Sequence, residues 1–321
     1  AVQIAGEVKD FNPSDYLPKD LIRKTDPFMQ YAYIAAEEAM KQSGIKIEPE
    51  RTGIVMGTAM AGIATIAYTQ EALTGASHKK VGPRFIPKIL GNIAAANIAI
   101  DYNIQGPSFT VSTACSSGGD AINTACMCMQ SGKADIMLAV GAESVLCPLV
   151  IYSLANAKAL SRRNDSPSTA SRPFDVTRDG FVIGEGGGAL VLETEESANG
   201  RNARKYAEIK GYAQAHRPVS YDNSEVDSKA VVEVIEKACM NAGIEADNID
   251  IVCCDDRKII KTLMPCYDVS QEIGNARAAA SAMTAAYAAE LLSDSEKNYE
   301  YGLALSMGAG GTYSAVILKK V

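Results

Sequence analysis

A single cysteine stands in the stretch VSTACSSGGDAI, residues 111–122, between an apolar segment and a run of small residues. The residues before Cys115 are typical of a buried strand, and those after it are typical of a buried helix. A helix N-terminus carries partial positive charge, which favours a thiolate over a thiol. The stretch therefore predicts a turn that presents Cys115 as a nucleophile.

A cysteine nucleophile normally works with a nearby base, most often a histidine. The 321 residues contain two histidines, His78 and His216. Both stand in loop-like surroundings, GASHKKVGPR and AQAHRPV, where a solvated side chain is the simpler interpretation. The sequence therefore presents a nucleophile without its usual partner.

Composition limits the classes of protein to consider. Lysine and arginine number 31 against 38 aspartates and glutamates, a net charge of −7, which disfavours nucleic acid as a partner. No apolar run approaches the roughly 20 residues that span a bilayer, so no membrane contact is predicted. The eight cysteines stand in apolar or helical contexts without the spacing of zinc sites. This pattern favours a reducing cytoplasm and predicts neither a metal nor a cofactor.

Strand-like and helix-like segments alternate along the chain, which predicts a layered α/β fold. The predicted strands are residues 51–60, 108–113, 135–144, 184–194, 206–215, 249–255, 302–311 and 312–320. The predicted helices are residues 26–44, 91–108, 118–134, 228–244 and 276–292. GEGGGALVLE (184–193) and GAGGTYSAVILKK (308–320) are both glycine-rich turns that enter an apolar strand. This likeness predicts an internal duplication, with halves over residues 1–200 and 201–321.

Four stretches resemble the β-ketoacyl-acyl-carrier-protein synthases of the elongating type: QGPSFTVSTACSSGGDAI, GAES, ALSRRNDSPSTASRPFDVTRDGFVIGEGGGALVLE and GAGGT. The resemblance implies a thiolase-like fold, in which two duplicated halves form five αβαβα layers and dimerise through the strand SFTVST. It also implies an oxyanion hole of two backbone N–H groups, at Cys115 and Ala309. The opening AVQIAGEVKDFNPSDYL resembles sequence from inside the family's first half, so the first N-terminal strand and helix are expected to be absent.

The resemblance breaks down at the two histidines that complete the family's catalytic set. Asp255 stands where the first is expected, after IDIVCC, and Arg277 stands where the second is expected, in EIGNARAAASAM. An aspartate opposes the negative charge that builds up in decarboxylation, and a guanidinium does not shuttle protons. We therefore expect Asp255 and Arg277 to pair in the space of the histidines, and condensation to be lost. A register shift of one residue, or ordinary surface roles for both charges, is the alternative.

Loss of catalytic residues makes the chain similar to the chain-length factors of type II polyketide systems, although its retained cysteine departs from that subgroup. Such a subunit heterodimerises with a catalytic ketosynthase and shapes the tunnel for the polyketide or polyene chain. The resemblance places Val81 and Phe85 of KKVGPRFIP at that tunnel and interface. The second expected partner is an acyl carrier protein, for which the candidate docking residues are Lys79, Lys80, Arg84, Lys88, Arg162 and Arg163.

The alternative function is that of an enzyme. In this interpretation Cys115 serves an active β-ketoacyl synthase or an acyltransferase that works on acyl-carrier-protein thioesters. Removal of Cys115 separates the two functions, because a structural subunit needs no acylated thiol.

Overall fold

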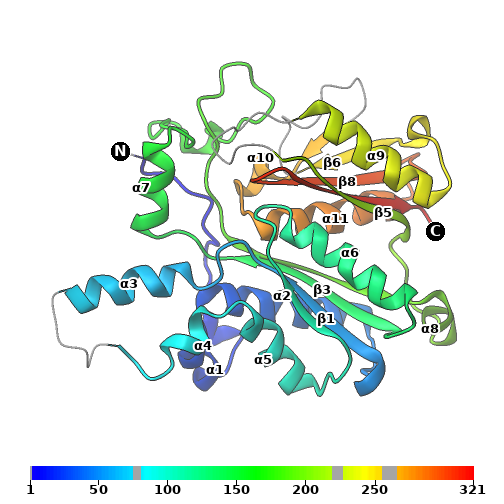
Figure 1. Ribbon diagram of the computed structural model, residues 1–321, viewed down its shortest axis with the longest axis horizontal. Coiled ribbons are helices and arrows are strands. Elements are labelled where there is room, and N and C mark those ends of the chain that lie inside the picture. Colours follow the sequence, from blue (N-terminus) through cyan, green and yellow to red (C-terminus); the bar gives the residue numbers. More distant parts are fainter. Residues whose placement is uncertain (1, 75–80, 219–226, 255–265) are drawn as a thin grey trace.

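The structure, a computed structural model, describes residues 2–74, 81–218, 227–254 and 266–321 (Figure 1). The strands of the first half are β1 (Thr52–Gly57), β2 (Ser108–Val111), β3 (Ile136–Glu143) and β4 (Gly186–Glu193). Its helices are α1 (Lys19–Lys24), α2 (Pro27–Ser43), α3 (Ile63–Thr74), α4 (Phe85–Ile89), α5 (Asn92–Tyr102), α6 (Ser117–Gln130), α7 (Pro148–Asn156) and α8 (Glu195–Gly200).

The second half is shorter and contains more strands among the described residues. Its strands are β5 (Glu208–His216), β6 (Ile251–Cys254), β7 (Cys266–Asp268), β8 (Tyr301–Gly308) and β9 (Thr312–Lys319). Its helices are α9 (Ser228–Ala242), α10 (Ser270–Ile273) and α11 (Ala278–Ser293). None of the helices in the described ranges is both long enough and apolar enough to cross a bilayer.

Helix α2 shows how local sequence sets the ends of these elements. The Asp26 carboxylate caps its N-terminus by accepting a hydrogen bond from the Phe28 N–H, and Pro27 occupies the first turn. Gly44 ends the helix in the left-handed conformation, with φ of 63°, which a residue without a side chain adopts at little cost. The predicted helix over 26–44 is therefore confirmed by the mechanism expected from its end signals.

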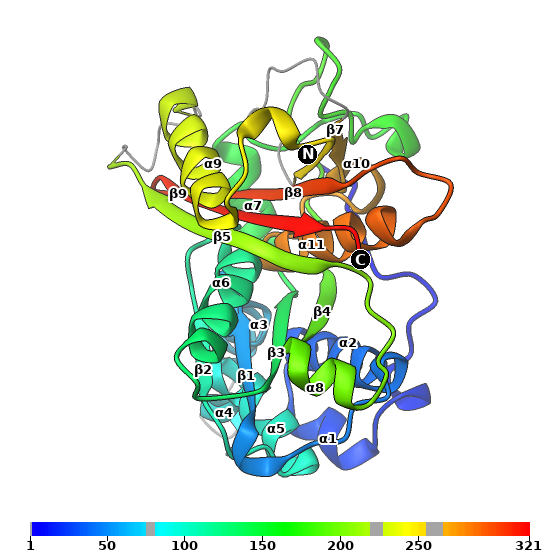
Figure 2. The ribbon, with the colours of Figure 1, turned by 90° about the vertical axis from the view of Figure 1, so that its right-hand side faces the viewer.

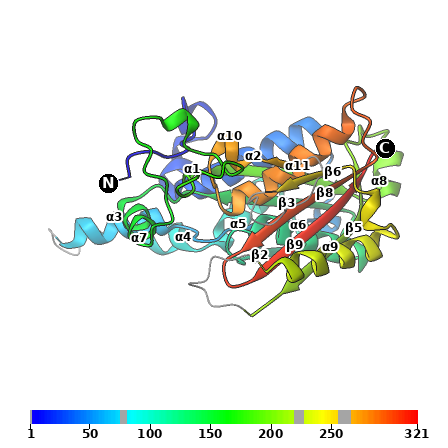
Figure 3. The same ribbon diagram turned by 90° about the horizontal axis from the view of Figure 1, so that it is seen from above.

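The elements stack in five layers, as the family resemblance implied (Figure 2). Helices α2 and α5 cover the outer face of the first sheet, and α6 and α11 lie between the two sheets. Helix α9 covers the outer face of the second sheet along β5 and β9 (Figure 3). Three clusters of buried apolar side chains fill the interfaces, one under each outer helical layer and one around the middle layer. The middle cluster ties the halves together, because both sheets contribute to it.

The two sheets repeat one strand order. In the first, β3 and β1 are parallel neighbours, β1 is parallel to β2, and β3 is antiparallel to β4. In the second, β8, β6, β7 and β9 stand in the same relations. The second sheet has one more strand, β5, which pairs antiparallel with β9. Within the described residues, β4 has no neighbour at the corresponding edge.

Candidate active site

Cys115 lies in the turn between β2 and the N-terminus of α6, as the sequence predicted. Three short hydrogen bonds hold this turn. The Thr113 N–H donates to Ser117 Oγ (2.9 Å), Ser117 Oγ–H donates to the Ala114 carbonyl (2.5 Å), and Ser116 Oγ–H donates to the Thr113 carbonyl (2.8 Å). Ala114 takes a positive φ of 55°, an uncommon conformation for a residue with a side chain. The backbone around Cys115 is therefore tightly fixed, and the thiol is partly exposed.

The second half brings Arg277 to this cysteine. Arg277 Nη1 lies 3.4 Å from Cys115 Sγ, although the two residues are 162 positions apart. Arg277 stands directly before α11, and its backbone has φ of 54° and ψ of −126°. Its N–H donates to Asn275 Oδ1 (3.1 Å), which holds the bend that directs the chain into α11. The predicted nucleophile Cys115 therefore has a permanent cation beside it.

The Arg277 side chain is enclosed on its other sides. Its Cζ lies 5.0 Å from the centroid of the Phe181 ring, a cation–π contact. Its Nε and Nη2 atoms are buried and have no hydrogen-bond partner. The Nη1 atom thus makes the one side-chain hydrogen bond that the described residues give this guanidinium, and it makes it to the cysteine.

Two buried carboxyl groups support the site from the first half. Glu143, at the end of β3, is fully buried and accepts hydrogen bonds from Thr58 Oγ1 (3.0 Å) and from the N–H groups of Ala59 (2.7 Å) and Met60 (3.0 Å). Burial raises the pKa of Glu143, while these donors and the charge of Arg277 oppose that rise. Glu143 therefore fixes the turn after β1, and its carboxyl group lies near enough to Arg277 to interact with its charge.

Asp120, in the first turn of α6, is the second carboxyl group. Its Oδ2 accepts hydrogen bonds from Thr113 Oγ1 (2.5 Å) and Ser116 Oγ (3.3 Å). Burial raises the pKa of Asp120, and the Thr113 hydrogen bond is the largest effect that opposes the rise. Sequence reasoning missed this residue. The available signal was an aspartate inside an otherwise small and apolar helix, five residues after the cysteine.

The turn between β8 and β9 packs directly against the nucleophile turn. A side-chain carbon at Gly308 would lie 2.0 Å from the Thr113 carbonyl oxygen, so this close approach requires glycine. Ala309 follows at once and is exposed. The contact brings the two residues predicted to form the oxyanion hole, Cys115 and Ala309, to adjoining turns. Their role as hydrogen-bond donors stays a prediction.

The structure gives less information on several other predicted site residues. Asp255 lies outside the described residues, so its pairing with Arg277 stays a prediction, and His78, Lys79 and Lys80 are also outside. His216 is exposed at the end of β5, with Nδ1 3.4 Å from Thr312 Oγ1. Val81 and Phe85 are half-buried, and Phe85 begins α4. The tunnel role of Val81 and Phe85 stays a prediction.

Two of the candidate docking arginines already have carboxylate neighbours. Arg84 Nη1 lies 3.8 Å from Asp20 Oδ1, and Arg163 Nε lies 3.3 Å from Asp179 Oδ1. All four side chains are partly or largely exposed, so each pair is weak and screened by salt. Docking of a carrier protein at these residues therefore stays a prediction.

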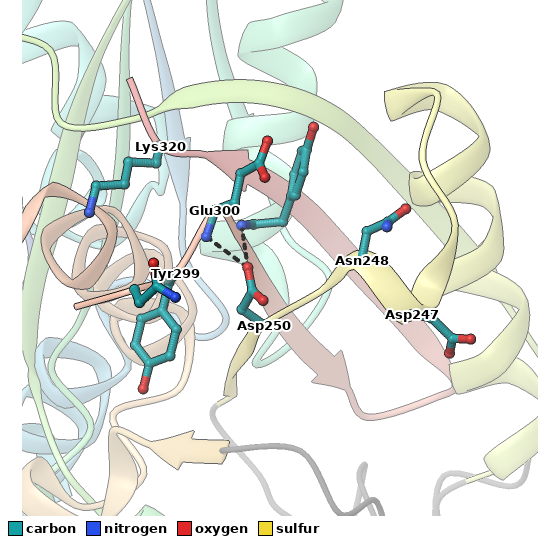
Figure 4. A pocket seen from close by; sticks show the side chains of 8 residues that line it. Asp247, Asn248, Asp250, Tyr299, Glu300 and Lys320 are labelled. Atoms are coloured by element: carbon teal, nitrogen blue, oxygen red, sulfur yellow. Dashed lines mark hydrogen bonds between the residues drawn. The ribbon is translucent and has the colours of Figure 1, made fainter.

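A polar pocket of about 510 Å³ lies away from this site (Figure 4). It opens where β8 begins, whereas the turn that packs on Cys115 follows the end of β8. Asp250 Oδ2 in this pocket accepts hydrogen bonds from the N–H groups of Glu300 (2.7 Å) and Tyr301 (3.0 Å). These bonds join the start of β8 to the residue before β6, which gives the carboxylate a structural role.

Comparison with known proteins identifies the fold around this site. Residues 4–198 match the family described as the N-terminal domain of β-ketoacyl synthases. The chain belongs to the β-ketoacyl synthase family. Its five-layer architecture is accordingly thiolase-like, with Cys115 in the matched region.

Curated relatives agree with this membership. The chain is 35% identical over 320 residues to a 3-oxoacyl-[acyl-carrier-protein] synthase 2 of Vibrio cholerae, a match that covers 99% of this chain and 74% of that protein. It is 36% identical over 253 residues to the protein of the same name from Coxiella burnetii, which covers 78% of this chain and 61% of that protein. Most of this ketosynthase-family chain therefore has a counterpart in named synthases, whereas parts of those synthases have none here.

Solved structures share the fold. A β-ketoacyl synthase from Burkholderia phymatum superposes with a TM-score of 0.88 at 23% identity and covers all of this chain and 88% of that one. The ishigamide ketosynthase/chain length factor gives 0.86 at 24% identity, with 98% of this chain and 87% of that chain covered. A ketosynthase of a type II polyketide synthase, in complex with its acyl-carrier protein and bound to the hexaketide, gives 0.84 at 24%. It covers 99% of this chain and 88% of that one. At these identities the likeness concerns the fold alone.

Proposed function

We propose that this ketosynthase-family chain is a chain-length-factor-like subunit that pairs with a catalytic ketosynthase and shapes its tunnel without performing condensation. The contact between Arg277 and Cys115 carries the proposal. A guanidinium keeps its protons at physiological pH, so it neither takes a proton from the thiol nor returns one to a leaving group. The nucleophile thus has a fixed cation where the chemistry requires a proton-transferring group.

The edge strand β2 supports a partner on the side of Cys115. It is the outer strand of the first sheet, and within the described residues its far edge is unpaired. Phe109 in this strand is 46% exposed. An unpaired edge with an exposed aromatic side chain is suited to pairing with a strand of another subunit. Such pairing would place the nucleophile turn next to the partner.

The test of this pairing is co-expression with a catalytic ketosynthase from the same source. We expect a one-to-one heterodimer, measured by light scattering after size-exclusion chromatography. Phe109→Glu should weaken it at least tenfold, whereas Val232→Glu, at an exposed apolar residue on the outer helix α9, should not. A chain that remains alone, or pairs equally well after Phe109→Glu, would refute this subunit role.

A second function, acyl transfer through Cys115, is favoured by the same site. The thiol is partly exposed, stands at a helix N-terminus and faces Arg277, all of which suit a thiolate. Incubation with an acyl thioester followed by intact-mass measurement separates the two functions. A structural subunit gains no acyl mass, and its Cys115→Ala variant still supports product formation by the heterodimer. Acylation that turns over and is lost with Cys115→Ala would instead establish the enzyme.

A further inference from the structure

Two cysteines that take no part in the Cys115 site lie beside each other in the second sheet. Cys254 ends β6 and Cys266 begins β7, and their Sγ atoms are 3.6 Å apart. The two strands are parallel, and Cys254 stands two residues beyond Val252, which is the partner of Cys266. Residues two apart on a strand point to the same face, so both sulfurs lie on one face of the sheet.

The neighbouring Cys253 shows which face of the sheet this is. Cys253 belongs to the apolar cluster between the two sheets, whereas Cys266 packs against the cluster beneath α9. The side chain of Cys254 therefore points away from that of Cys253 and toward that of Cys266. Cys254 is fully buried and Cys266 is partly exposed, so a small molecule in solution meets the pair at Cys266.

The strand that carries Cys266 can make the short movement that a covalent bond requires. A disulfide holds its two sulfurs about 2 Å apart, closer than their present contact. Strand β7 has three residues and, within the described part of the chain, pairs with β6 alone at the edge of the sheet. A short edge strand that is held on one side shifts at less cost than an inner strand. The sulfurs can therefore approach while β6 and the strands beyond it stay in place.

We propose that Cys254 and Cys266 form a reversible disulfide site, oxidised by a low-molecular-weight disulfide such as oxidised glutathione. The Cys266 thiolate attacks one sulfur of the oxidant, breaks its S–S bond and releases one small thiol. The Cys254 thiolate then attacks Cys266 Sγ, releases the second small thiol and forms the bond within the protein. The two cysteines give up two protons and two electrons, which reduce the oxidant to two thiols. This site lies beyond the proposed subunit role and does not depend on it.

The bond acts on the chain between β7 and α10. The Cys254 carbonyl already accepts a hydrogen bond from the Val269 N–H (3.2 Å), directly before α10. A covalent link at Cys266 adds a second tie between β6 and this segment, which continues through α10 to Arg277. We therefore expect residues 267–273 to open less often in the oxidised chain than in the reduced chain.

Peptide mapping tests the proposal on the full 321-residue chain. The reduced chain is incubated with oxidised glutathione at about pH 8, where part of a cysteine is thiolate, then unfolded with a thiol-blocking reagent and digested with trypsin. Arg257, Lys258 and Lys261 stand between the two cysteines, so the peptides that carry them stay joined only through the bond. We expect a link that dithiothreitol cleaves and an intact mass lower by about two units. Amide hydrogen exchange across residues 267–273 should be about tenfold slower in the linked chain.

Two variants at adjacent positions identify the reacting sulfurs. Cys254→Ala should abolish the link and leave glutathione on Cys266, because no second thiol displaces it. Cys253→Ala removes the neighbouring cysteine from the same tryptic peptide and should leave the link intact. Circular dichroism verifies that both variants are folded, and the link in the unaltered chain tests the proposal without either of them.

Several results would overturn the proposal. They are a glutathione adduct at Cys266 that persists in the unaltered chain, no reaction at Cys266, a link that survives Cys254→Ala or is lost in Cys253→Ala, and a bond between two chains. Exchange that is no slower in the linked chain would contradict the tie to α10. None of these results bears on the proposed subunit role, since that role uses neither cysteine of the pair.

Discussion

The two halves of the molecule differ at the edges of their sheets and in what each contributes around Cys115. The first half holds the turn around Cys115 with its hydrogen bonds and buried carboxyl groups, and among the described residues no strand pairs with the outer edge of β4. The second half has the fuller sheet, with β9 covered by β5, but it brings an arginine to the cysteine. Helices α6 and α11 of the middle layer join the halves, so the difference at the sheet edges and the difference at Cys115 lie in separate parts of the molecule.

The sharpest test of this comparison uses Leu190 of β4 and Val316 of β9, which oppose Ala139 of β3 and Ala304 of β8 at equivalent places in the two sheets. Val316→Lys buries an unpaired charge in a covered strand and should cost more than about 3 kcal/mol of unfolding free energy. Leu190→Lys should cost about 1 kcal/mol, because Leu190 is only partly buried and lines a pocket of about 540 Å³ through which a lysine stem can extend to water. Urea unfolding measures both. Equal losses would show that β4 is as well covered as β9.

A second test concerns the packing that joins the halves. A side-chain carbon at Gly118 of α6 would lie 2.3 Å from the Ala278 carbonyl oxygen of α11, so Gly118→Ala should cost about 2–3 kcal/mol. The same substitution at Gly200, which has no heavy atom within 4 Å of the added carbon, should leave thermal stability nearly unchanged. A tolerated Gly118→Ala would mean that the two helices can separate without loss.

A third test concerns the cation that the second half contributes. Removing the charge with Arg277→Gln should slow alkylation of Cys115 by iodoacetamide at pH 7 about tenfold, since a nearby opposite charge favours the thiolate. Arg277→Lys keeps the charge and should recover most of the rate. Peptide-level mass spectrometry distinguishes Cys115 from partly exposed Cys266 and from the six buried cysteines. An unchanged rate in the glutamine variant would show that the 3.4 Å contact has no effect on the thiol.

The smallest expected effect belongs to the buried carboxyl group of the first half. Burial raises the pKa of Asp120 above its ordinary value of 3.8, so the folded chain holds this proton to higher pH than the unfolded chain does. The resulting stabilisation is present at low pH and is lost as the pH rises through the raised pKa. Asp120→Asn should remove about 1 kcal/mol of this pH dependence between pH 4 and 8, measured by urea unfolding. An identical pH dependence in the variant would contradict the assignment to Asp120.

Local signals explain what the sequence could predict. Asp26 and Gly44 mark the ends of α2, and the change from apolar to small residues around Cys115 marks the nucleophile turn. The order of strands and helices followed from such patterns, which predict a layered α/β fold, whereas the five layers were implied by the family resemblance. The three-residue strand β7 was not predicted, because a segment of that length has no periodicity to detect.

Contacts between distant residues explain what the sequence could not predict. Glu143 fixes a turn whose N–H donor is 84 positions away, and nothing near Glu143 in the sequence indicates that partner. The pocket lined by residues 189–193 of β4 also takes side chains from α2, α6, α8 and α11 and from β5, so no segment alone reveals it. The register at Arg277 could be argued from the family resemblance, whereas its contact with Cys115 required the structure.

At Arg277, the stability of the fold and the reactivity of the Cys115 thiol favour different residue types. With φ of 54°, this position would suit glycine, and a residue with a side chain in so sparsely populated a conformation costs about 1–3 kcal/mol. Arg277→Gly should relax that strain while it removes the cation from Cys115. A chain under selection for folding alone would gain from that exchange. Arg277 therefore places a positive charge beside the Cys115 thiol at the expense of an unfavourable backbone conformation.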